Sequence, residues 1–381
     1  MMNLRNHSLY CAIFLVLHQA QVTLGQSSYL SNAVTATKTL QNWYNATSGL
    51  WDTTGWWNSA NCITMLADLT AIDASVDNIT EDVFSTTFNQ AQEYNLKELK
   101  FNETHKCTWS DCPGETPELQ PKGFLNGYYD DEGWWALAWL KVYDLTGQPQ
   151  YLQAASDIFD DMVFTGYNAT CGGIWWDRAQ TYQSAIANEL FLSVAAHLAS
   201  RKPNKAYYVD WAQRHWKWFQ DSGLINGDNN INDGLDASTC KNNNGRVYTY
   251  NQGVVLGALV ELHAAAPNDS YISTARTIAS SAIKALTDTN GILHEAGEPD
   301  LGGDGDQFKG VFVRNLRVLQ KVTGDEEFKQ FIERNAQSIW QYDRDESTNS
   351  LGPVWSGPFS RVNAATQSSA LDALVAAAAV Q

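Results

Sequence analysis

The sequence predicts an all-α protein, a toroid of six helical hairpins known as an (α/α)6 barrel. Strand signals are scarce along the 381 residues, and apolar residues recur at helical spacing. Two kinds of helical segment alternate strictly. One kind carries a single apolar stripe, as in residues 205–222, and the other is apolar nearly all round, as in residues 185–199. A striped helix lies at a surface and an all-apolar helix is buried, so six alternating pairs predict an inner ring inside an outer ring.

The predicted elements follow one another along the chain without a low-complexity linker. The striped, outer candidates fall near residues 28–48, 80–98, 150–164, 205–221, 270–287 and 326–341. The buried, inner candidates fall near residues 58–75, 131–146, 181–200, 250–265, 307–321 and 364–380. The last of these is an alanine-rich tail that Asp372 interrupts, which favours a core helix over a lipid-anchor signal. We therefore expect a single domain over residues 26–381.

The first 25 residues are typical of a signal peptide and are excluded from the predicted fold. Arg5 and His7 precede the apolar run LYCAIFLVL, and small residues follow near a cleavage point after Gly25. The run is too short to span a membrane. Beyond this segment, five Asn-x-Ser/Thr sequons, which accept N-linked glycans in secreted proteins, begin at Asn45, Asn78, Asn102, Asn168 and Asn268. The sequence therefore predicts a secreted, N-glycosylated protein.

The charge of the chain excludes several classes of partner. The formal net charge is −17, which argues against nucleic acid, an anionic membrane surface and acidic sugars as ligands. We expect no stable membrane insertion, a monomeric protein, and no metal or other cofactor. The stretch DNNINDGLD (228–236) is acidic, but it lacks the spacing of a calcium-binding loop and is better explained as a turn.

Five cysteines follow the predicted signal peptide: Cys62, Cys107, Cys112, Cys171 and Cys240. Disulfides are expected in an oxidising compartment, but an odd number leaves at least one thiol outside any intrachain pair. Cys107 is close enough to Cys112 to close a small loop, and Cys171 and Cys240 both fall in loops that could meet. The sequence proves neither pairing, and the spacings do not resemble a zinc site.

The loops that lead into the inner helices are rich in Gly, Asn, Asp and aromatic residues. In a toroid all six loops would open on one face. Three Trp-Trp pairs stand at loop-to-helix junctions: Trp56–Trp57, Trp134–Trp135 and Trp175–Trp176. Tryptophan stacks against the C–H faces of sugar rings, and an apolar cleft with a few polar groups is the general form of a small-ligand site. A single Trp is well explained as core filler, but three pairs beside Asn and Asp favour a sugar-binding cleft.

Two adjacent aspartates, Asp130 and Asp131, stand where an apolar helix begins in NGYYDDEGWWALAW (126–139). Helix capping explains one of them, and Glu132 suits a first-turn position beside the helix dipole. Glycoside hydrolysis explains both, because it needs two carboxyls, about 5–5.5 Å apart in retaining enzymes and about 6.5–9.5 Å apart in inverting ones. Neighbouring Cα atoms lie about 3.8 Å apart, so the shorter spacing is reached more easily. The pair therefore weakly favours retention.

Repulsion between the two carboxylates would divide their roles. Like charges raise the pKa of one partner, so that one Asp stays protonated as the acid while the other is ionised as the nucleophile. The residues alone do not say which Asp takes which role. They also leave catalysis and capping about equally supported.

The stretch YYDDEGWWALAWLKVYDLTG resembles the signature of glycoside hydrolase family 76, the endo-α-1,6-mannanases. CGGIWW, SAIANELFLSVAAHLA, YTYNQGVVLGAL and FKGVFVRNL are similar too, and the likeness runs in order from about residue 30 to the end. The resemblance implies an (α/α)6 barrel that cleaves α-1,6-linked mannose chains with retention. It also implies that Asp130 is the nucleophile and Asp131 the acid/base.

The Trp pairs, the loops and the resemblance together give a set of predicted substrate contacts. They are Trp56, Trp57, Tyr129, Trp134, Trp175, Trp176, Asn188, Arg246, Tyr250, Asn251, Gln252, Phe308 and Lys309. Ordinary surface exposure explains Lys309 and Arg246 about as well as substrate binding does. The same holds for Asp306, a loop residue that could bond a sugar hydroxyl.

Two alternatives to hydrolysis stay open. One fungal branch of the family is thought to act as a cell-wall transglycosidase that moves lipid-anchored proteins onto wall glucan, and its members usually carry a lipid-anchor tail. No such tail is evident here, and YYDDEGWW is more similar to the mannan-cleaving branch, so we expect hydrolysis of α-1,6-linked mannan. The other alternative is a mannan-binding protein without catalysis, which the presence of both aspartates disfavours.

Overall fold

The computed structural model describes residues 28–95 and 123–381, which contain twelve α-helices. The first covers residues 28–41. It is followed by α2 (Trp56–Thr70), α3 (Asp77–Gln90), α4 (Tyr129–Thr146), α5 (Pro149–Asp161), α6 (Ala185–Ala199), α7 (Lys205–Asp221), α8 (Thr249–Ala265), α9 (Asp269–Ala285), α10 (Gly302–Thr323), α11 (Glu326–Tyr342) and α12 (Ala364–Ala379). The predicted signal peptide, the sequon at Asn102, Cys107 and Cys112 lie outside the described residues.

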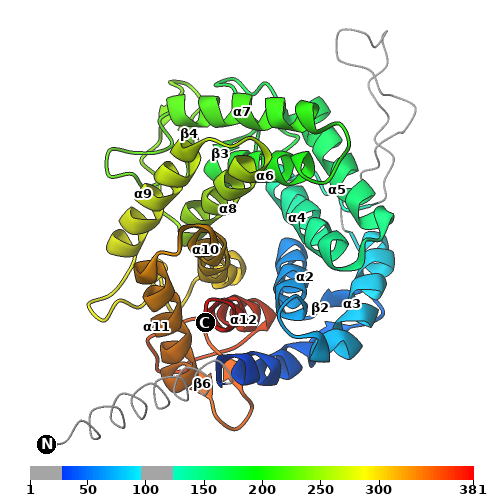
Figure 1. Ribbon diagram of the computed structural model, residues 1–381, viewed down its shortest axis with the longest axis vertical. Helices are drawn as coiled ribbons and strands as arrows, with labels where there is room; N and C mark the ends of the chain where they lie inside the picture. Colours follow the sequence, from blue (N-terminus) through cyan, green and yellow to red (C-terminus); the bar gives the residue numbers. More distant parts are fainter. Residues whose placement is uncertain (1–27, 96–122) are drawn as a thin grey trace, which may run out of the picture.

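The helices form two concentric rings (Figure 1). The even-numbered helices pack in sequence order, α2 on α4, α4 on α6, α6 on α8, α8 on α10 and α10 on α12, and α12 packs on α2 to close the inner ring. The outer helices pack on the inner ones, for example α5 on α4, α7 on α6 and α9 on α8. The predicted (α/α)6 barrel is confirmed, with the inner and outer helices in the predicted alternation.

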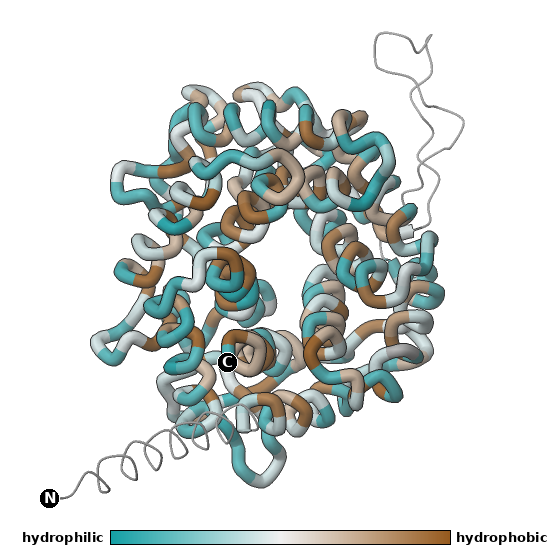
Figure 2. The backbone as a smooth tube through the Cα atoms, viewed as in Figure 1, coloured by the Kyte–Doolittle hydropathy of each residue, from teal (hydrophilic) through white to brown (hydrophobic). Residues whose placement is uncertain are grey.

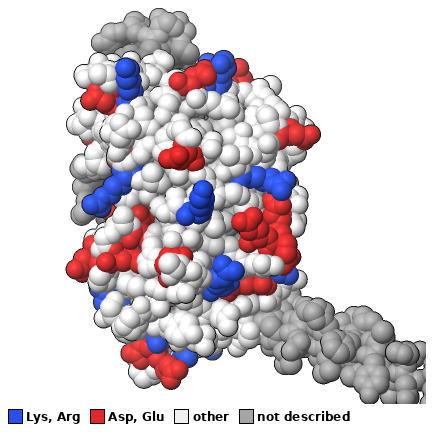
Figure 3. Space-filling model, turned by 90° about the vertical axis from the view of Figure 1, so that its left-hand side faces the viewer, with Lys and Arg blue, Asp and Glu red and all other residues white. Residues whose placement is uncertain are grey.

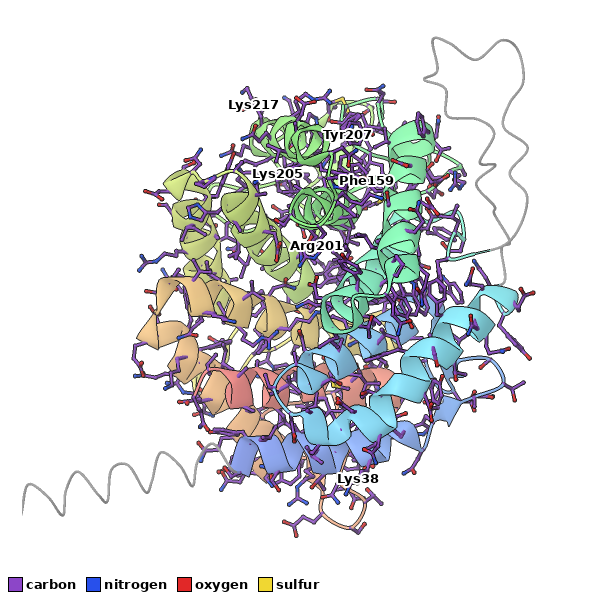
Figure 4. The ribbon with its side chains drawn as sticks, turned by 45° about the vertical axis from the view of Figure 1, so that its right-hand side comes forward. Lys38, Phe159, Arg201, Lys205, Tyr207 and Lys217 are labelled. Carbon is purple, nitrogen blue, oxygen red and sulfur yellow. A yellow bond between two sulfur atoms is a disulfide. The ribbon has the colours of Figure 1, made fainter. Side chains whose placement is uncertain are left out.

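Burial follows the two sequence patterns. Every residue of α6 except His197 is buried, whereas α11 buries only one face, which includes Phe328, Phe331 and Ile332. Figure 2 shows the apolar residues on the inner ring and on the inward faces, with polar residues along the outer rim. In Figure 4 the exposed Lys205 and Lys217 lie at the rim on α7. The predicted C-terminal core helix is α12, which is buried except at its last residue.

Glycine lets the inner helices approach one another closely. A Cβ atom at Gly253 of α8 would lie 2.6 Å from the Cα of Phe312 in α10. A Cβ at Gly310 of α10 would lie 2.6 Å from the Cα of Ser369 in α12. Real Cβ atoms do not approach other heavy atoms so closely, so the α8–α10–α12 packing requires glycine at both positions.

Short strands tie the loops together. β1 (Tyr44–Asn45) pairs with β2 (Leu50–Trp51), β6 (Arg344–Asp345) pairs with β7 (Ser350–Leu351), and β4 (Gly234–Asp236) lies between β3 (Gln183–Ser184) and β5 (Lys241–Asn242), all antiparallel. A disulfide joins Cys171 to Cys240 beside the three-stranded sheet, and Cys62 is buried with a free thiol. Within residues 28–95 and 123–381, no helix has the length and apolar character needed to cross a membrane.

Candidate active site

A cleft of about 760 Å³ opens where five inner helices begin. Its lining includes residues at the starts of α2, α4, α6, α8 and α10, as expected for loops that share one face of a toroid. The loop between α9 and α10, with Glu295 to Gly297 and Asp300 to Leu301, forms a further part of the wall. No residue of α12 belongs to the lining. Both Asp130 and Asp131 line this cleft.

The aspartates occupy the second and third positions of α4. The N-cap position belongs to Tyr128, whose side chain makes no capping hydrogen bond, so neither aspartate is the N-cap residue. The carboxylate of Glu132 accepts the backbone N–H groups of Asn126 and Gly127 at 3.1 and 2.9 Å. Glu132 therefore fixes the turn that delivers the aspartates into the cleft, which is more than the first-turn charge predicted for it.

Asp130 is the member of the pair that ionises more readily. Burial raises its pKa to about 7. The indole N–H of Trp176, which donates to Oδ2 of Asp130 at 2.8 Å, and the backbone N–H groups at the helix start favour the charged form. The other oxygen, Oδ1, is buried and has no hydrogen-bond partner in the described protein. An ionised Asp130 thus has one oxygen held and one left for a reacting atom.

Asp131 holds its proton more firmly. Burial raises the pKa of Asp131 well above its usual range, and the charge of Asp130 raises it further. The amide of Asn126 donates to Oδ2 of Asp131 at 2.6 Å and partly opposes this rise. Since two neighbouring buried carboxylates do not both ionise easily, a single proton on the pair resides mainly on Asp131.

A buried ionic cluster supports the start of α4 from behind. Arg178 lies 3.5 Å from Glu132, forms an ion pair with Asp161, and donates to the hydroxyl of Thr165 at 2.7 Å. The hydroxyl of Tyr129 also donates to Thr165, at 3.0 Å. Burial raises the pKa of Glu132 to about 8, which the positive charge of Arg178 counteracts. The cluster joins α4 to the end of α5 and to the loop that carries Trp176.

Aromatic rings form two walls of the cleft. Trp57 stacks on Trp134 with centroids 5.5 Å apart, and Tyr250 stacks on Phe308 at 3.9 Å. On the side of Trp176, the ring of Tyr128 lies 5.0 Å from the indole. Flat apolar faces beside carboxylates match the C–H faces and hydroxyls of a sugar chain.

The lining is strongly acidic. It contains the carboxylates of Asp130, Asp131, Asp233, Glu295, Asp300 and Asp304, against one guanidinium, that of Arg246. The negative charge of Asp304 contributes to the raised pKa of both catalytic candidates. Such a cleft repels anionic ligands, so the expectation that acidic sugars are excluded applies to the cleft itself.

Many of the predicted site residues meet in this cleft. The predicted residues in the lining are Asp130, Asp131, Trp57, Trp134, Trp176, Arg246, Tyr250 and Phe308. They come from α2, α4, α8, α10 and two loops. The structure places their side chains together; their individual roles toward a substrate stay predictions.

Three predicted aromatic residues lie behind the cleft wall. Trp56 packs against Phe124 and Trp135 in the core. Tyr129 is buried and bonds Thr165, and Trp175 is 8% exposed. Successive residues of a helix point about 100° apart, so Trp56 and Tyr129, the first residues of α2 and α4, face the core while Trp57 and Asp130 face the cleft. In the extended loop, neighbouring residues face opposite ways, so Trp176 lines the cleft and Trp175 does not.

Four predicted polar residues are also absent from the lining. Asn188 bonds the backbone of Ile174 and Ser184, and Gln252 bonds both backbone groups of Ile231. Asn251 is fully buried. Lys309, 2% exposed, pairs with Glu298, so the alternative of a surface charge is wrong for it. Asp306 is likewise buried and bound by Arg361 and Asn363.

The structure adds residues that the sequence did not single out. Asp233 accepts a hydrogen bond from the hydroxyl of Tyr182 at 2.7 Å, and Asp304 accepts one from the indole of Trp57, also at 2.7 Å. Glu295 accepts from the backbone N–H and the hydroxyl of Thr249, at 2.9 and 2.6 Å, and so fixes the start of α8. Asp233 belongs to the stretch that was explained as a turn. In residues 28–95 and 123–381, no three His, Cys, Asp or Glu side chains are grouped to hold a metal ion.

Comparison with known proteins gives a consistent result. Residues 28–381 match the model of glycosyl hydrolase family 76. Mannan endo-1,6-alpha-mannosidase DCW1 of Candida glabrata is 29% identical over 205 residues, which are 49% of this chain and 45% of that protein. The protein of the same name from Saccharomyces cerevisiae is 27% identical over 211 residues, 51% of this chain and 46% of that one. The chain thus spans about half the length of the curated relatives it matches.

Solved structures share the fold. The Lin0763 protein of Listeria innocua superposes with a TM-score of 0.76 at 23% identity, covering 92% of this chain and 97% of that one. A second solved structure is an inactive variant of the α-1,6-mannanase GH76A from Salegentibacter sp. HEL1_6, in which two consecutive aspartates are replaced by alanine and α-1,6-mannotetrose is bound. It superposes with a TM-score of 0.76 at 21% identity, covering 93% of this chain and 99% of that one. Dfg5 from Chaetomium thermophilum, in complex with glucosamine, superposes with a TM-score of 0.74 at 16% identity, covering 93% of this chain and 90% of that one.

Proposed function

Because this chain belongs to glycosyl hydrolase family 76, we propose that it is a retaining, endo-acting hydrolase of α-1,6-mannosidic bonds in mannan. The observation that carries the proposal is the adjacent pair Asp130 and Asp131 at the cleft. The names of the curated relatives support both the linkage and endo cleavage. The Salegentibacter mannanase, whose inactive variant lacks two consecutive aspartates, supports a catalytic role for such a pair.

In the first step, the Asp130 carboxylate attacks the anomeric carbon of the mannose on one side of the scissile bond. The Asp131 carboxyl gives its proton to the glycosidic oxygen as the bond to that oxygen breaks. The departing chain leaves with a new hydroxyl group, and the remaining mannose is held as an ester on Asp130. The readier ionisation of Asp130 and the firmer proton on Asp131 support this division of roles.

In the second step, the ionised Asp131 takes a proton from a water molecule, which attacks the anomeric carbon and releases Asp130. Two inversions at the same carbon give net retention. Asp131 is protonated again and Asp130 is ionised again, so the pair is ready for another cycle. The aromatic walls would hold the rings on either side of the bond while the carboxylates react.

The proposal is tested by separating the two steps. Asp130→Asn is expected to abolish hydrolysis of both α-1,6-mannan and an aryl α-1,6-mannobioside. Asp131→Asn is expected to lose mannan hydrolysis but to keep glycosylation by an aryl substrate, because a good leaving group needs no proton. The first measurement is the burst of phenol released from the aryl substrate. The second is the anomer of the product that forms first, which is identified by NMR. Full activity of either variant on mannan, or an inverted product, contradicts the mechanism.

Transfer to a sugar is a second candidate activity of the same site. The stacked Tyr250 and Phe308 offer a flat surface on which an acceptor sugar could replace the attacking water. A cell-wall transglycosidase would then form a new glycosidic bond from the same ester. Incubation with α-1,6-mannan and an added labelled oligosaccharide separates the two: transfer product in excess of free reducing ends would favour transglycosylation. A protein that binds mannan without turnover would show neither.

We further propose that the protein is secreted, N-glycosylated and monomeric. The sequon residues Asn78, Asn168 and Asn268 are exposed, and the disulfide between Cys171 and Cys240 suits an oxidising compartment. Recovery of the protein from culture medium tests secretion, and a loss of mass on glycosidase treatment tests N-glycosylation. Light scattering of the treated protein tests whether it is a monomer.

A further inference from the structure

A second groove, of about 470 Å³, lies on the outer ring beside α11. Its lining includes Arg334, Gln337, Gln341 and Tyr342 from the C-terminal half of α11, with Asn290 and Ser356 from two loops. We call it the α11 groove. Its volume lies within the range of about 300–1,000 Å³ that is usual for ligand sites.

The α11 groove is fixed by hydrogen bonds beneath it. The buried side chain of Asn335 accepts from the backbone N–H of Leu293 at 2.9 Å and so holds the loop that carries Asn290. The hydroxyl of Ser338 donates to the backbone carbonyl of Trp355 at 2.8 Å and holds the loop that carries Ser356. The three walls therefore keep their positions relative to one another.

Three of the polar side chains that line the α11 groove are uncommitted, whereas Ser338, which also lines it, is bound to Trp355. Among the described residues, the amides of Gln337 and Gln341 and the guanidinium of Arg334 make no hydrogen bond or ion pair. Arg334 lies against the turn at Gly291, where an added Cβ would come within 2.4 Å of its Nη1. These donors and acceptors therefore remain available to a ligand, and Arg334 is held against the groove wall.

An exposed aromatic ring lies beside these groups. Tyr342 is 56% exposed, one of four large hydrophobic side chains in the described residues that are left so open to solvent. Its backbone lies against Gly357, where an added Cβ would meet the carbonyl oxygen of Tyr342 at 2.5 Å. The close contact fixes the base of the residue and leaves the ring free to stack.

The chemistry of the α11 groove fits a neutral polysaccharide. Amide groups, hydroxyls and one guanidinium bond sugar hydroxyls, and an exposed tyrosine stacks on a pyranose face. An anionic polymer would need several cations together, and on the side of the barrel that carries α9 and α11 the basic side chains stand apart from one another (Figure 3). The groove contains the single cation Arg334.

One loop separates the α11 groove from the catalytic cleft. Ile292 lines the groove and Glu295 lines the cleft. Three residues of extended chain span at most about 11 Å, which is roughly the length of two sugar units in a polysaccharide. We propose that the α11 groove is a second binding site for a neutral polysaccharide, and that it holds the same chain whose other part lies in the cleft. Identification of that chain as α-1,6-mannan rests on the proposed function.

The proposal predicts a defect that depends on chain length. Tyr342→Ala and the double variant Gln337→Ala/Gln341→Ala are expected to raise KM for long α-1,6-mannan about 3- to 10-fold, because two linked sites bind a polymer more tightly than one. KM and kcat for an aryl α-1,6-mannobioside are expected to stay unchanged, since it is too short to reach the groove. Gln330→Ala, on α11 but outside the groove, is the matched control.

Affinity electrophoresis in gels that contain α-1,6-mannan, β-1,3-glucan or β-1,4-glucan tests binding without catalysis. The groove variants, but not Gln330→Ala, are expected to lose retardation in at least one neutral gel. This result would support the groove even if the wild-type protein failed to hydrolyse mannan, so the two proposals can fail separately. Unchanged retardation in every gel together with unchanged KM for the polymer would overturn the inference. Loss confined to a gel of acidic polysaccharide would overturn the assignment to a neutral chain.

Discussion

The indole N–H of Trp176 donates to Oδ2 of Asp130 at 2.8 Å, and the backbone carbonyl of Trp176 accepts from the N–H of Tyr129 at 2.9 Å. One loop residue thus holds both the start of α4 and the carboxylate that we assign as the nucleophile. The hydrogen bond favours the ionised form of Asp130, against the burial that raises its pKa to about 7. The other carboxylate oxygen, Oδ1, has no hydrogen-bond partner in the described protein.

Trp176→Phe is expected to shift the pH dependence of the enzyme. Loss of the indole donor raises the pKa of Asp130, so a larger fraction of the nucleophile is protonated at acid pH. A hydrogen bond to a charged group contributes about 1.5–3 kcal/mol, and one pKa unit corresponds to about 1.4 kcal/mol. The acidic limb of kcat/KM should therefore move up by about one pH unit. Trp340→Phe, on α11, should leave the profile unchanged, and an equal shift in both variants would contradict the argument.

Arg178→Met is expected to destabilise the protein strongly. The substitution leaves the buried carboxyls of Glu132 and Asp161 without their positive partner, and breaking a buried ion pair typically costs about 3–5 kcal/mol. The urea midpoint should fall and mannan hydrolysis should drop, because Glu132 holds the turn before Asp130. Arg214→Met removes an ion pair that is more than half exposed, and its unfolding curve should match the wild type. A stable Arg178→Met protein would show that the cluster is dispensable.

The two-ring architecture could be predicted from the sequence because the spacing of apolar residues indicates which faces of a helix are buried. An inner helix such as α6 has no polar face, and an outer helix such as α11 has one. The boundaries were less certain. α10 begins at Gly302, five residues before the predicted start at 307, because its glycines predict a loop and only tertiary contacts make them helical.

That shifted boundary explains which acid reaches the cleft. In a helix, residues two apart face different directions, so Asp304 turns to the cleft and Trp57 while Asp306 turns to Arg361. Asp233 escaped notice for another reason. It enters the cleft because β3 pairs with β4, which brings together residues about 50 positions apart in the sequence. No local sequence pattern predicts such a contact. Local patterns therefore located the cleft and the aspartate pair, and long-range pairing decided the rest of the lining.

Glu189→Gln is expected to stabilise the protein increasingly as the pH rises. Glu189 is fully buried in α6, neither carboxyl oxygen has a partner in the described protein, and burial raises its pKa well above the usual range. The folded state keeps its proton while the unfolded state ionises above about pH 4.3, so wild-type stability falls as pH rises from there toward the folded pKa. Gln is nearly isosteric and does not titrate. Urea unfolding at pH 4 and pH 7 should show a larger gain at pH 7, and a gain that does not change with pH would show that Glu189 is not the cause.

Gly253→Ala and Gly227→Ala are expected to change stability in opposite directions. Alanine is the better helix former by about 1 kcal/mol, yet its Cβ at position 253 would lie 2.6 Å from the Cα of Phe312. Helix backbones cannot yield as a flexible side chain can, so overpacking should outweigh propensity and cost about 1–3 kcal/mol. At Gly227 nothing lies within 4 Å and φ is not positive, so alanine should add a few tenths of a kcal/mol by restricting the unfolded chain. Denaturant unfolding of both variants checks the signs, and a neutral Gly253→Ala would mean that α8 and α10 can separate without cost.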